Sequence, residues 1–335
     1  MMRSHIYLQS EFWTQISSDS SVEGIRACMN VYDVLQDANI STNIDIEQLS
    51  NNLTNSNRFP FDRFLFQLFK DRFAGKGGSI DFDYAIEPVN ISIDQLCAIH
   101  FQELESATSS NIEDRWGVLL FNSSQIVKKQ ELFRGSGVML QKGILYKERF
   151  GKFAPILHVP CNSMIIIDPY ILANPRNIEN SFISWLDCVL PTSKLTVEFQ
   201  LSILSMINDD RGNQVYGEEI KRIHEKLSKI IKETRNGLKF SLSIFTIGKG
   251  EDFHSRNIIT NNILIQAPDG LDVYKPSGEA KRNAVFCLVI PRLYGDQRLD
   301  MTQYLNWIKI VKKRCMQASD ATFWGPRENR LFNLV

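Results

Sequence analysis

The chain has 335 residues, of which 43% are hydrophobic, so it is long enough for two domains with well-buried cores. Its 38 basic and 38 acidic residues give a net charge of zero, which removes the strong basic signature of a dedicated nucleic-acid-binding protein. The first 160 residues carry about four more acidic than basic residues, and the remainder reverses this balance. An anion-binding site is therefore expected in the second half.

The N-terminal residues MMRSHIYLQSEFW are too polar for a signal peptide, and no stretch has the apolar length of a membrane span. The six cysteines are scattered, with no Cys-x-x-Cys pair and no cluster of Cys and His at metal-ligand spacing. We therefore expect a cytoplasmic protein with reduced core thiols and with no bound metal or cofactor.

Apolar periodicity predicts helices at the start of the first half. The helix over 21–38 is expected to bury one face, made of Val22, Ile25, Cys28, Met29, Tyr32 and Leu35. A polar stretch with a short helix follows at 40–58, and an aromatic-rich helix over 61–74 ends on glycines. Short apolar runs at 96–102 and 116–122 predict buried strands. The first half is thus predicted to be a mixed α/β domain.

The pattern changes to strand-like pieces punctuated by glycine between about 135 and 160. The Gly-Ser-Gly at 135–137 lacks the lysine-serine pair of a phosphate-binding loop, so a turn is the better interpretation. We place the domain boundary near residue 155. The predicted domains are therefore 1–155 and 156–335.

Strands and helices alternate in the second half. A continuous apolar run over 162–172 predicts a buried strand that is stopped at Asp168 and Pro169. The further predicted elements are a helix at 177–189, a strand at 194–204, a helix at 217–237, a strand at 239–247, a hairpin over 254–275 and a final helix at 301–315. This alternation predicts an α/β domain with a largely parallel sheet that helices cover on both faces. Sites in such sheets gather at one edge of the strands.

Three short motifs of the second half occur in an order that resembles a known family. They are Ile-Ile-Ile-Asp-Pro-Tyr-Ile at 165–171, Phe-His-Ser-Arg at 253–256 and Gly-Leu-Asp at 270–272. Together they resemble the phospholipase D-like domain that follows MIT domains, and its bacterial relatives, over residues 165–275. The resemblance implies a phospholipase D-like fold for 156–335, and it does not extend to the first half.

The resemblance also implies roles for individual residues. In the wider phospholipase D superfamily, His-x-Lys is followed after four further residues by Asp, and two such copies build one active site. His254 then takes the position of the nucleophile, Arg256 that of the phosphate-binding lysine and Asn261 that of the aspartate. This chain offers one copy, so a two-histidine site requires two chains that meet across a twofold axis.

The departures from this signature have different consequences. Arg256 keeps a permanent positive charge and a planar fork suited to phosphate, so phosphate binding is expected at Arg256 and Asn261. Catalysis is less well supported, because Asn261 brings no negative charge and Ser255 replaces an acidic residue of the bacterial relatives. Asp168 either hydrogen-bonds the imidazole of His254 or caps the turn before Pro169.

Three hypotheses about function follow. The first is a phospholipase D-like module that dimerises and binds a phosphate group of nucleic acid or of a lipid head group without turnover. The alternative is a homodimeric, metal-independent phosphodiesterase or nuclease in which His254 attacks phosphorus. The third places the activity in the first half, where Asp81 and Asp83 share a predicted strand face without a wider carboxylate cluster. Bacterial proteins with such domains often resemble parts of defence systems, which makes nucleic acid a sensible target.

Overall fold

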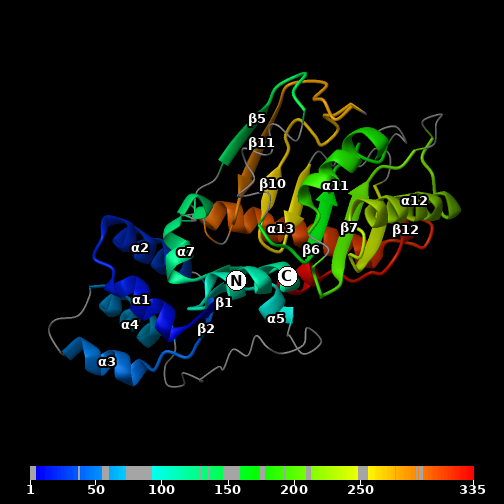
Figure 1. Ribbon diagram of the computed structural model, residues 1–335. Coiled ribbons are helices and arrows are strands. Elements are labelled where there is room, and N and C mark those ends of the chain that lie inside the picture. Colours follow the sequence, from blue (N-terminus) through cyan, green and yellow to red (C-terminus); the bar gives the residue numbers. More distant parts are fainter. Residues whose placement is uncertain are drawn as a thin grey trace.

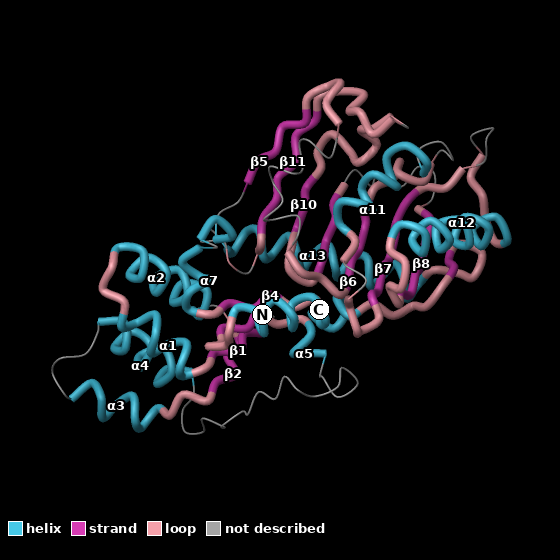
Figure 2. Tube along the Cα trace, viewed as in Figure 1, coloured by secondary structure: helices cyan, strands magenta, loops and turns pink. Residues whose placement is uncertain are grey.

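The computed structural model organises the chain around two β-sheets (Figure 1, Figure 2). The structure describes residues 5–36, 38–54, 60–72, 93–128, 130–133, 136–145, 159–173, 178–191, 194–208, 213–247, 256–275, 277–291, 293 and 297–335. Asp81, Asp83, His254 and Ser255 lie outside these ranges. Within them, no helix has the length and apolar character that a membrane-crossing segment requires.

The first sheet is parallel and has the strand order β2-β1-β3-β4. Its strands are β1 His5–Leu8, β2 Asn39–Thr42, β3 Ile99–Phe101 and β4 Leu119–Phe121. The apolar runs predicted to be strands form β3 and β4, all of whose residues are buried. The prediction did not include β1 and β2, because runs of four residues show too little alternation to stand out from their polar surroundings.

Helices accompany this sheet, as the predicted mixed α/β class requires. They are α1 Ser10–Ser18, α2 Val22–Gln36, α3 Ile46–Thr54, α4 Pro60–Arg72, α5 Ile93–Leu96, α6 Ser106–Trp116 and α7 Ser123–Lys128, and a 3-10 turn follows at Gln130–Phe133. The buried face predicted for helix α2 is partly correct, because Cys28 and Leu35 are buried as predicted. Val22 and Met29 are exposed, whereas Ala27, Val31 and Val34 are buried, because α2 turns its small residues toward α1, α4 and α7.

The second, larger sheet is mixed and has the strand order β12-β8-β7-β6-β9-β10-β11-β5. Its strands are β5 Ser136–Leu140, β6 Ser163–Ile167, β7 Phe199–Ser205, β8 Phe240–Thr246, β9 Asn257–Thr260, β10 Leu264–Gln266, β11 Ala284–Val289 and β12 Phe323–Trp324. Strands β6, β7 and β8 are parallel, and the remaining pairings are antiparallel. The predicted hairpin is formed by β9 and β10.

Strand β5 precedes residue 155 and yet pairs with β11 of the larger sheet. The chain therefore passes from the first sheet to the larger sheet between β4 and β5. The division of the chain into domains 1–155 and 156–335 stays a prediction. The two halves are also joined at Gly117, which ends α6 with a φ of +64°. A Cβ at this position would lie 2.5 Å from the main-chain carbonyl of Cys161, so only glycine allows this approach.

Helices cover both faces of the larger sheet, as predicted. A π-helical turn, Ile178–Phe182, continues into α11 Ile183–Val189, and α12 Glu218–Thr234 lies beside it, in front of the strands in Figure 1. Helix α13, Gln297–Gln317, lies behind them. Alternate residues of β6 show the division, because Ile166 belongs to the core cluster that contains α11 and α12, whereas Ile165 and Ile167 pack with α13.

The C-terminal segment is part of the core. A 3-10 turn at Arg330–Leu334 buries Leu331 and Phe332 against α13, and Asn329 donates to the Ser202 hydroxyl of β7 at 3.0 Å. Arg330 donates to the carbonyl of Asn162 at 3.0 Å, and burial lowers the pKa of its guanidinium. This segment stabilises the sheet from within the molecule.

Candidate functional site

The predicted site lies at one edge of the larger sheet, where β6 ends and its antiparallel neighbour β9 begins. Ile167, the last residue of β6, pairs with Asn257, the first residue of β9. Asp168 and Arg256 are the next residues outward on the two strands, so the fold brings them to the same edge. This is the carboxyl edge of the parallel strands, where ligands of α/β sheets most often bind.

Asp168 holds two turns together. It is 1% exposed, its Oδ1 accepts from the Tyr170 amide at 2.7 Å, and its Oδ2 accepts from the Leu271 amide at 2.7 Å. Burial raises the pKa of Asp168, whereas the two backbone donors and the charge of Arg256 act in the opposite direction. The first bond is the turn cap predicted for Asp168. A hydrogen bond from Asp168 to His254 stays a prediction, because His254 lies outside the described residues.

Arg256 is held by contacts from the other two motifs. Its Nη1 donates to the carbonyl of Pro268 at 2.8 Å, and its Cζ lies 5.3 Å from the ring centroid of Tyr170, a cation–π distance. Gly270 has a φ of +86°, and a Cβ there would lie 3.3 Å from the Arg256 Cδ. The Nε of Arg256 is buried and has no hydrogen-bond partner among the described residues. Buried donors are normally paired, so this one requires water or another acceptor.

Hydrogen bonds from buried and half-buried side chains hold the Gly-Leu-Asp turn in place. The indole of the fully buried Trp185 in α11 donates to the carbonyl of Leu271 at 2.8 Å. Asp272 accepts from Lys281 at 2.6 Å and from Ser181 at 2.9 Å.

All three motifs of the resemblance meet at Arg256, because this residue contacts the Asp-Pro-Tyr turn and lies against the Gly-Leu-Asp turn. Tyr170 and Gly270 stand within these motifs, but the sequence alone did not indicate that they belong to the site.

Asn261 lies at the other end of β9. Asn261 is five positions after Arg256, which corresponds to roughly 16 Å along an extended strand. Asn261 is fully buried, its Nδ2 donates to the carbonyl of Gly117 at 2.9 Å, and its Oδ1 accepts from the Asn162 amide at 2.9 Å. The Asn162 side chain in turn donates to the carbonyl of Leu96 at 2.7 Å. These two asparagines join the larger sheet to the ends of α5 and α6, and their side chains are used by these contacts.

The basic residues of α12 form ion pairs within the helix. Lys221 lies 3.5 Å from Glu218, and Arg222 lies 3.0 Å from Glu219. Lys229 lies 3.9 Å from Glu233. Such pairs between exposed side chains are typical of a solvated helix surface.

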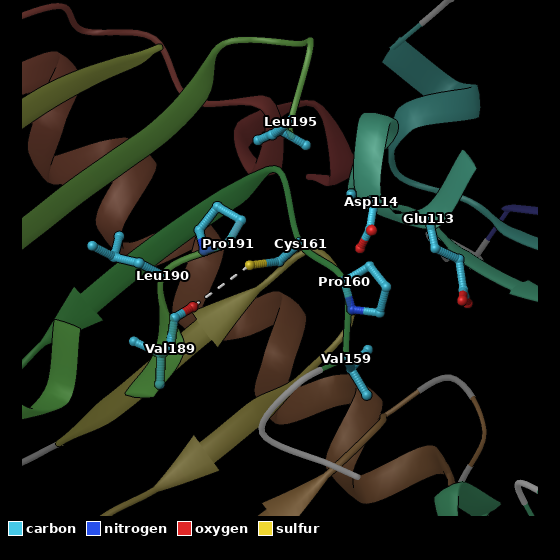
Figure 3. A pocket seen from close by; sticks show the side chains of 10 residues that line it. Glu113, Asp114, Val159, Pro160, Cys161, Val189, Leu190, Pro191 and Leu195 are labelled. Carbon is cyan, nitrogen blue, oxygen red and sulfur yellow. Dashed lines mark hydrogen bonds between the residues drawn. The ribbon is translucent and has the colours of Figure 1, made fainter. Parts of the chain in front are cut away.

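A small pocket of about 90 Å³ lies near the junction of the two halves, lined by residues that include Glu113, Gly117 and Cys161 (Figure 3). The thiol of Cys161 points toward the carbonyl of Val189 and donates to it at 3.9 Å. Burial raises the pKa of Cys161 to about 12, so the thiol stays protonated near neutral pH. The side chain of Glu113 accepts from the amide of Leu120 at 3.0 Å. The described lining of this pocket therefore includes no reactive thiol.

Three histidines outside the predicted site make structural contacts. The His5 ring is bonded to Ser41 at 2.8 Å, the buried His100 stacks on Tyr7, and His224 is bonded to the carbonyl of Leu242 at 2.9 Å. Within the described ranges, no group of three or more His, Cys, Asp or Glu residues is placed to hold a metal ion.

Comparisons with known proteins do not assign the chain to a family. No family model and no curated protein matches its sequence. Similar solved structures include TrmBL2, an archaeal chromatin protein with a novel mode of DNA binding (15% identity, 54% of this chain and 52% of that chain, TM-score 0.26). The chain thus spans about half the length of TrmBL2.

Two further similar structures are enzymes. One is Nuc, a phospholipase D family member from Salmonella typhimurium (14% identity, 52% of this chain and 93% of that chain, TM-score 0.29). The other is phosphatidylserine synthase from Haemophilus influenzae Rd KW20 (11% identity, 99% of this chain and 84% of that chain, TM-score 0.30). TM-scores this low assign neither a fold family nor a function to this chain.

Proposed function

We propose that the second half of the chain is a phospholipase D-like module that binds a phosphate group through Arg256. The observation that carries this proposal is the convergence of the three motifs on Arg256 at the carboxyl edge of β6. The motifs are separated by many residues in the sequence, so their meeting depends on the fold. The phosphate belongs to nucleic acid or to a lipid head group.

The surroundings of Arg256 suit an oxyanion. The contacts to Pro268 and Tyr170 fix the guanidinium in place, which lowers the entropy cost of binding. Neither contact neutralises the charge, because one partner is a carbonyl and the other an aromatic ring. Both oxygens of the buried Asp168 carboxyl already accept backbone donors. The positive charge of Arg256 is therefore available to a ligand.

A binding measurement tests Arg256 directly. The probes are a 5′-phosphorylated single-stranded DNA oligonucleotide and vesicles that contain phosphatidylserine, and the matched control variant is Arg222→Ala, whose side chain is 75% exposed on α12. Arg256→Ala should weaken the recognised probe about tenfold or more, because a charge-assisted hydrogen bond contributes about 1.5–3 kcal/mol. Arg256→Lys should weaken it less, because the charge is kept. Equal losses for Arg256→Ala and Arg222→Ala would contradict the proposal.

We further propose that the module forms a homodimer and that His254 belongs to the same site. Turnover is the alternative outcome, in which His254 is the nucleophile of a metal-independent phosphodiesterase. The test measures cleavage of nucleic acid and of a phosphodiester dye with chelator present, and sedimentation gives the oligomeric state. Chelator-resistant activity that His254→Ala abolishes establishes the enzyme. An inert wild-type protein that still binds a phosphorylated probe establishes the binding module.

A further inference from the structure

A second pocket lies at the carboxyl ends of β7 and β8, and we call it the β7–β8 pocket. Its volume of about 530 Å³ is within the range of roughly 300–1,000 Å³ typical of small-molecule sites. Residues that line it include Leu204, Tyr216, Phe245, Ile310, Lys313 and Arg314. The pocket shares the sheet edge of Arg256 but opens on the face covered by α13, whereas the Gly-Leu-Asp turn beside Arg256 is bonded to Trp185 on the face of α11.

The walls of the β7–β8 pocket are apolar and aromatic. Leu204 and Phe245 are buried and pack with α13, so they form a rigid floor. Tyr216 is 51% exposed and Ile310 is 37% exposed, although both are large hydrophobic residues. Exposed apolar side chains that line a concave site favour a ligand with a flat or apolar group. An aromatic ring such as that of Tyr216 is the usual platform on which a nucleobase stacks.

The rim of the pocket is basic. Lys313 is exposed, Arg314 is half-buried, and none of the described residues that line the pocket is acidic. The C-terminal end of α13 would by itself repel an anion, because its last carbonyls carry partial negative charge. Arg327 offsets this effect, since its guanidinium donates to the carbonyls of Cys315 and of Ala318, the latter at 2.8 Å. The pocket therefore combines a positive rim with an aromatic wall.

Polar side chains at the strand ends complete the site. Gln214, Thr246 and Thr322 line the pocket between its floor and its rim. The Gln214 amide nitrogen donates to the carbonyl of Ile247 at 2.9 Å, which fixes the segment that leads to Tyr216. The Thr246 hydroxyl accepts from the Gln214 amide at 3.3 Å, and the Thr322 hydroxyl donates to the carbonyl of Ser319 at 3.1 Å. These side chains therefore shape the wall, and recognition of a ligand depends on the aromatic ring and the basic rim.

From this combination we infer that the β7–β8 pocket binds a nucleotide, with the base against Tyr216 and the phosphate at Lys313 and Arg314. The nucleotide is either free or part of a single strand. This inference is independent of the proposed function, because Arg256 does not line the pocket. Tyr216→Ala therefore tests the pocket alone, and Arg256→Ala tests the phosphate-binding module alone.

The experiment is a calorimetric titration of the full chain with adenosine 5′-monophosphate, adenosine, ribose 5-phosphate and inorganic phosphate. We expect the nucleotide to bind more tightly than each of the other three, because it alone reaches both the aromatic wall and the basic rim. Tyr216→Ala should raise its Kd about tenfold, and Tyr216→Phe should restore binding. Lys313→Ala should raise the Kd about fivefold at low salt and less at high salt.

Lys309→Ala is the matched control, because Lys309 is exposed on the same helix and does not line the pocket. It should leave the Kd unchanged. The inference is overturned if ribose 5-phosphate or inorganic phosphate binds as tightly as the nucleotide. It is also overturned if Tyr216→Ala leaves the Kd of the nucleotide unchanged while the circular dichroism of the variant stays native. Equal changes of the Kd in Lys309→Ala and Lys313→Ala would overturn it as well. Absence of saturable nucleotide binding at millimolar concentration also overturns it.

An oligodeoxyadenylate distinguishes the two sources of the nucleotide. Tighter binding of the oligonucleotide than of the free nucleotide, with the same dependence on Tyr216, identifies a single strand as the ligand. Equal or weaker binding of the oligonucleotide identifies the free nucleotide. Oligonucleotide binding that does not depend on Tyr216 excludes a single strand as the ligand of the pocket and leaves the free nucleotide, whose own dependence on Tyr216 decides the inference.

Discussion

The two ends of strand β9 show how the same kind of sequence feature leads to different roles. At its start, Arg256 lies beside the partly exposed ring of Tyr170, and its guanidinium charge is not neutralised by a described ion pair. At its end, Asn261 is fully buried and bonded to main-chain groups of Gly117 and Asn162. The resemblance drawn from the sequence predicts both residues to bind phosphate, as positions of one signature. The comparison teaches that a motif position contributes to a site only if its polar atoms are not already used by the fold.

The largest effect is expected from Asn261→Asp, which restores the acidic residue of the signature. The new carboxylate would face the carbonyl of Gly117 in the core, so the free energy of unfolding should fall by about 3–5 kcal/mol at pH 7. Burial raises the pKa of such a carboxyl, so the loss should shrink as the pH falls and the group is protonated. Urea denaturation between pH 4 and pH 8 measures this change.

Asn306→Asp, on the exposed face of α13, is the matched control and should change the stability by less than about 0.5 kcal/mol. A stable Asn261→Asp variant with altered phosphate binding would instead place residue 261 in the site, and the contrast between the two ends of β9 would disappear.

A smaller loss, about 1–3 kcal/mol, is expected from Asp168→Asn. The carboxylate accepts one backbone N–H on each oxygen, whereas an amide has a single acceptor oxygen and would turn its NH₂ toward the other donor. Chemical denaturation measures the loss, and Asp320→Asn, at an exposed position, serves as the control. An unchanged stability would mean that Asp168 does not hold the two turns together.

The same variant tests the pH dependence of stability. In the unfolded protein the pKa of Asp168 is the ordinary value for Asp, about 3.9, and burial raises this pKa in the folded protein. Between these two pKa values the folded state binds more protons than the unfolded state. The contribution of Asp168 to stability should therefore fall as the pH rises from the unfolded-state pKa to the raised folded-state pKa. Asp168→Asn should remove this slope from the difference between the two proteins.

The smallest of these effects, about 1–2 kcal/mol, is expected from Gly270→Ala. Its φ of +86° disfavours any side chain, and the added Cβ would press on the Arg256 Cδ. Gly143→Ala is a matched control, because Gly143 has a φ of +85° and open space around its Cα. Thermal denaturation should show a similar loss for both variants, whereas only Gly270→Ala should also weaken the phosphate probe. A loss of probe binding in both variants would indicate a general effect of stability.

Much of the fold could be predicted because many of its strands and helices have a recognisable local sequence pattern. The apolar run before Asp168 predicted β6, and the helix predicted at 301–315 lies within α13. The buried face of α2 could be predicted only in part, since apolar residues lie all around this helix and only its neighbours decide which of them are covered. Strands such as β1 and β12 are too short to show a periodicity, and they form because they pair with a neighbouring strand.

By itself, the sequence determined the α/β class, the succession of strands and helices in the second half, and the presence of a permanent cation at residue 256. Only the tertiary structure decided that Arg256 lies against Tyr170 and Gly270, and that Asn261 is enclosed between the two sheets. The same is true of the β7–β8 pocket, whose residues come from two strands, a loop and a distant helix. The physical reason is that local propensity acts within a few residues, whereas burial and hydrogen-bond partners are supplied by segments that meet only after the chain has folded.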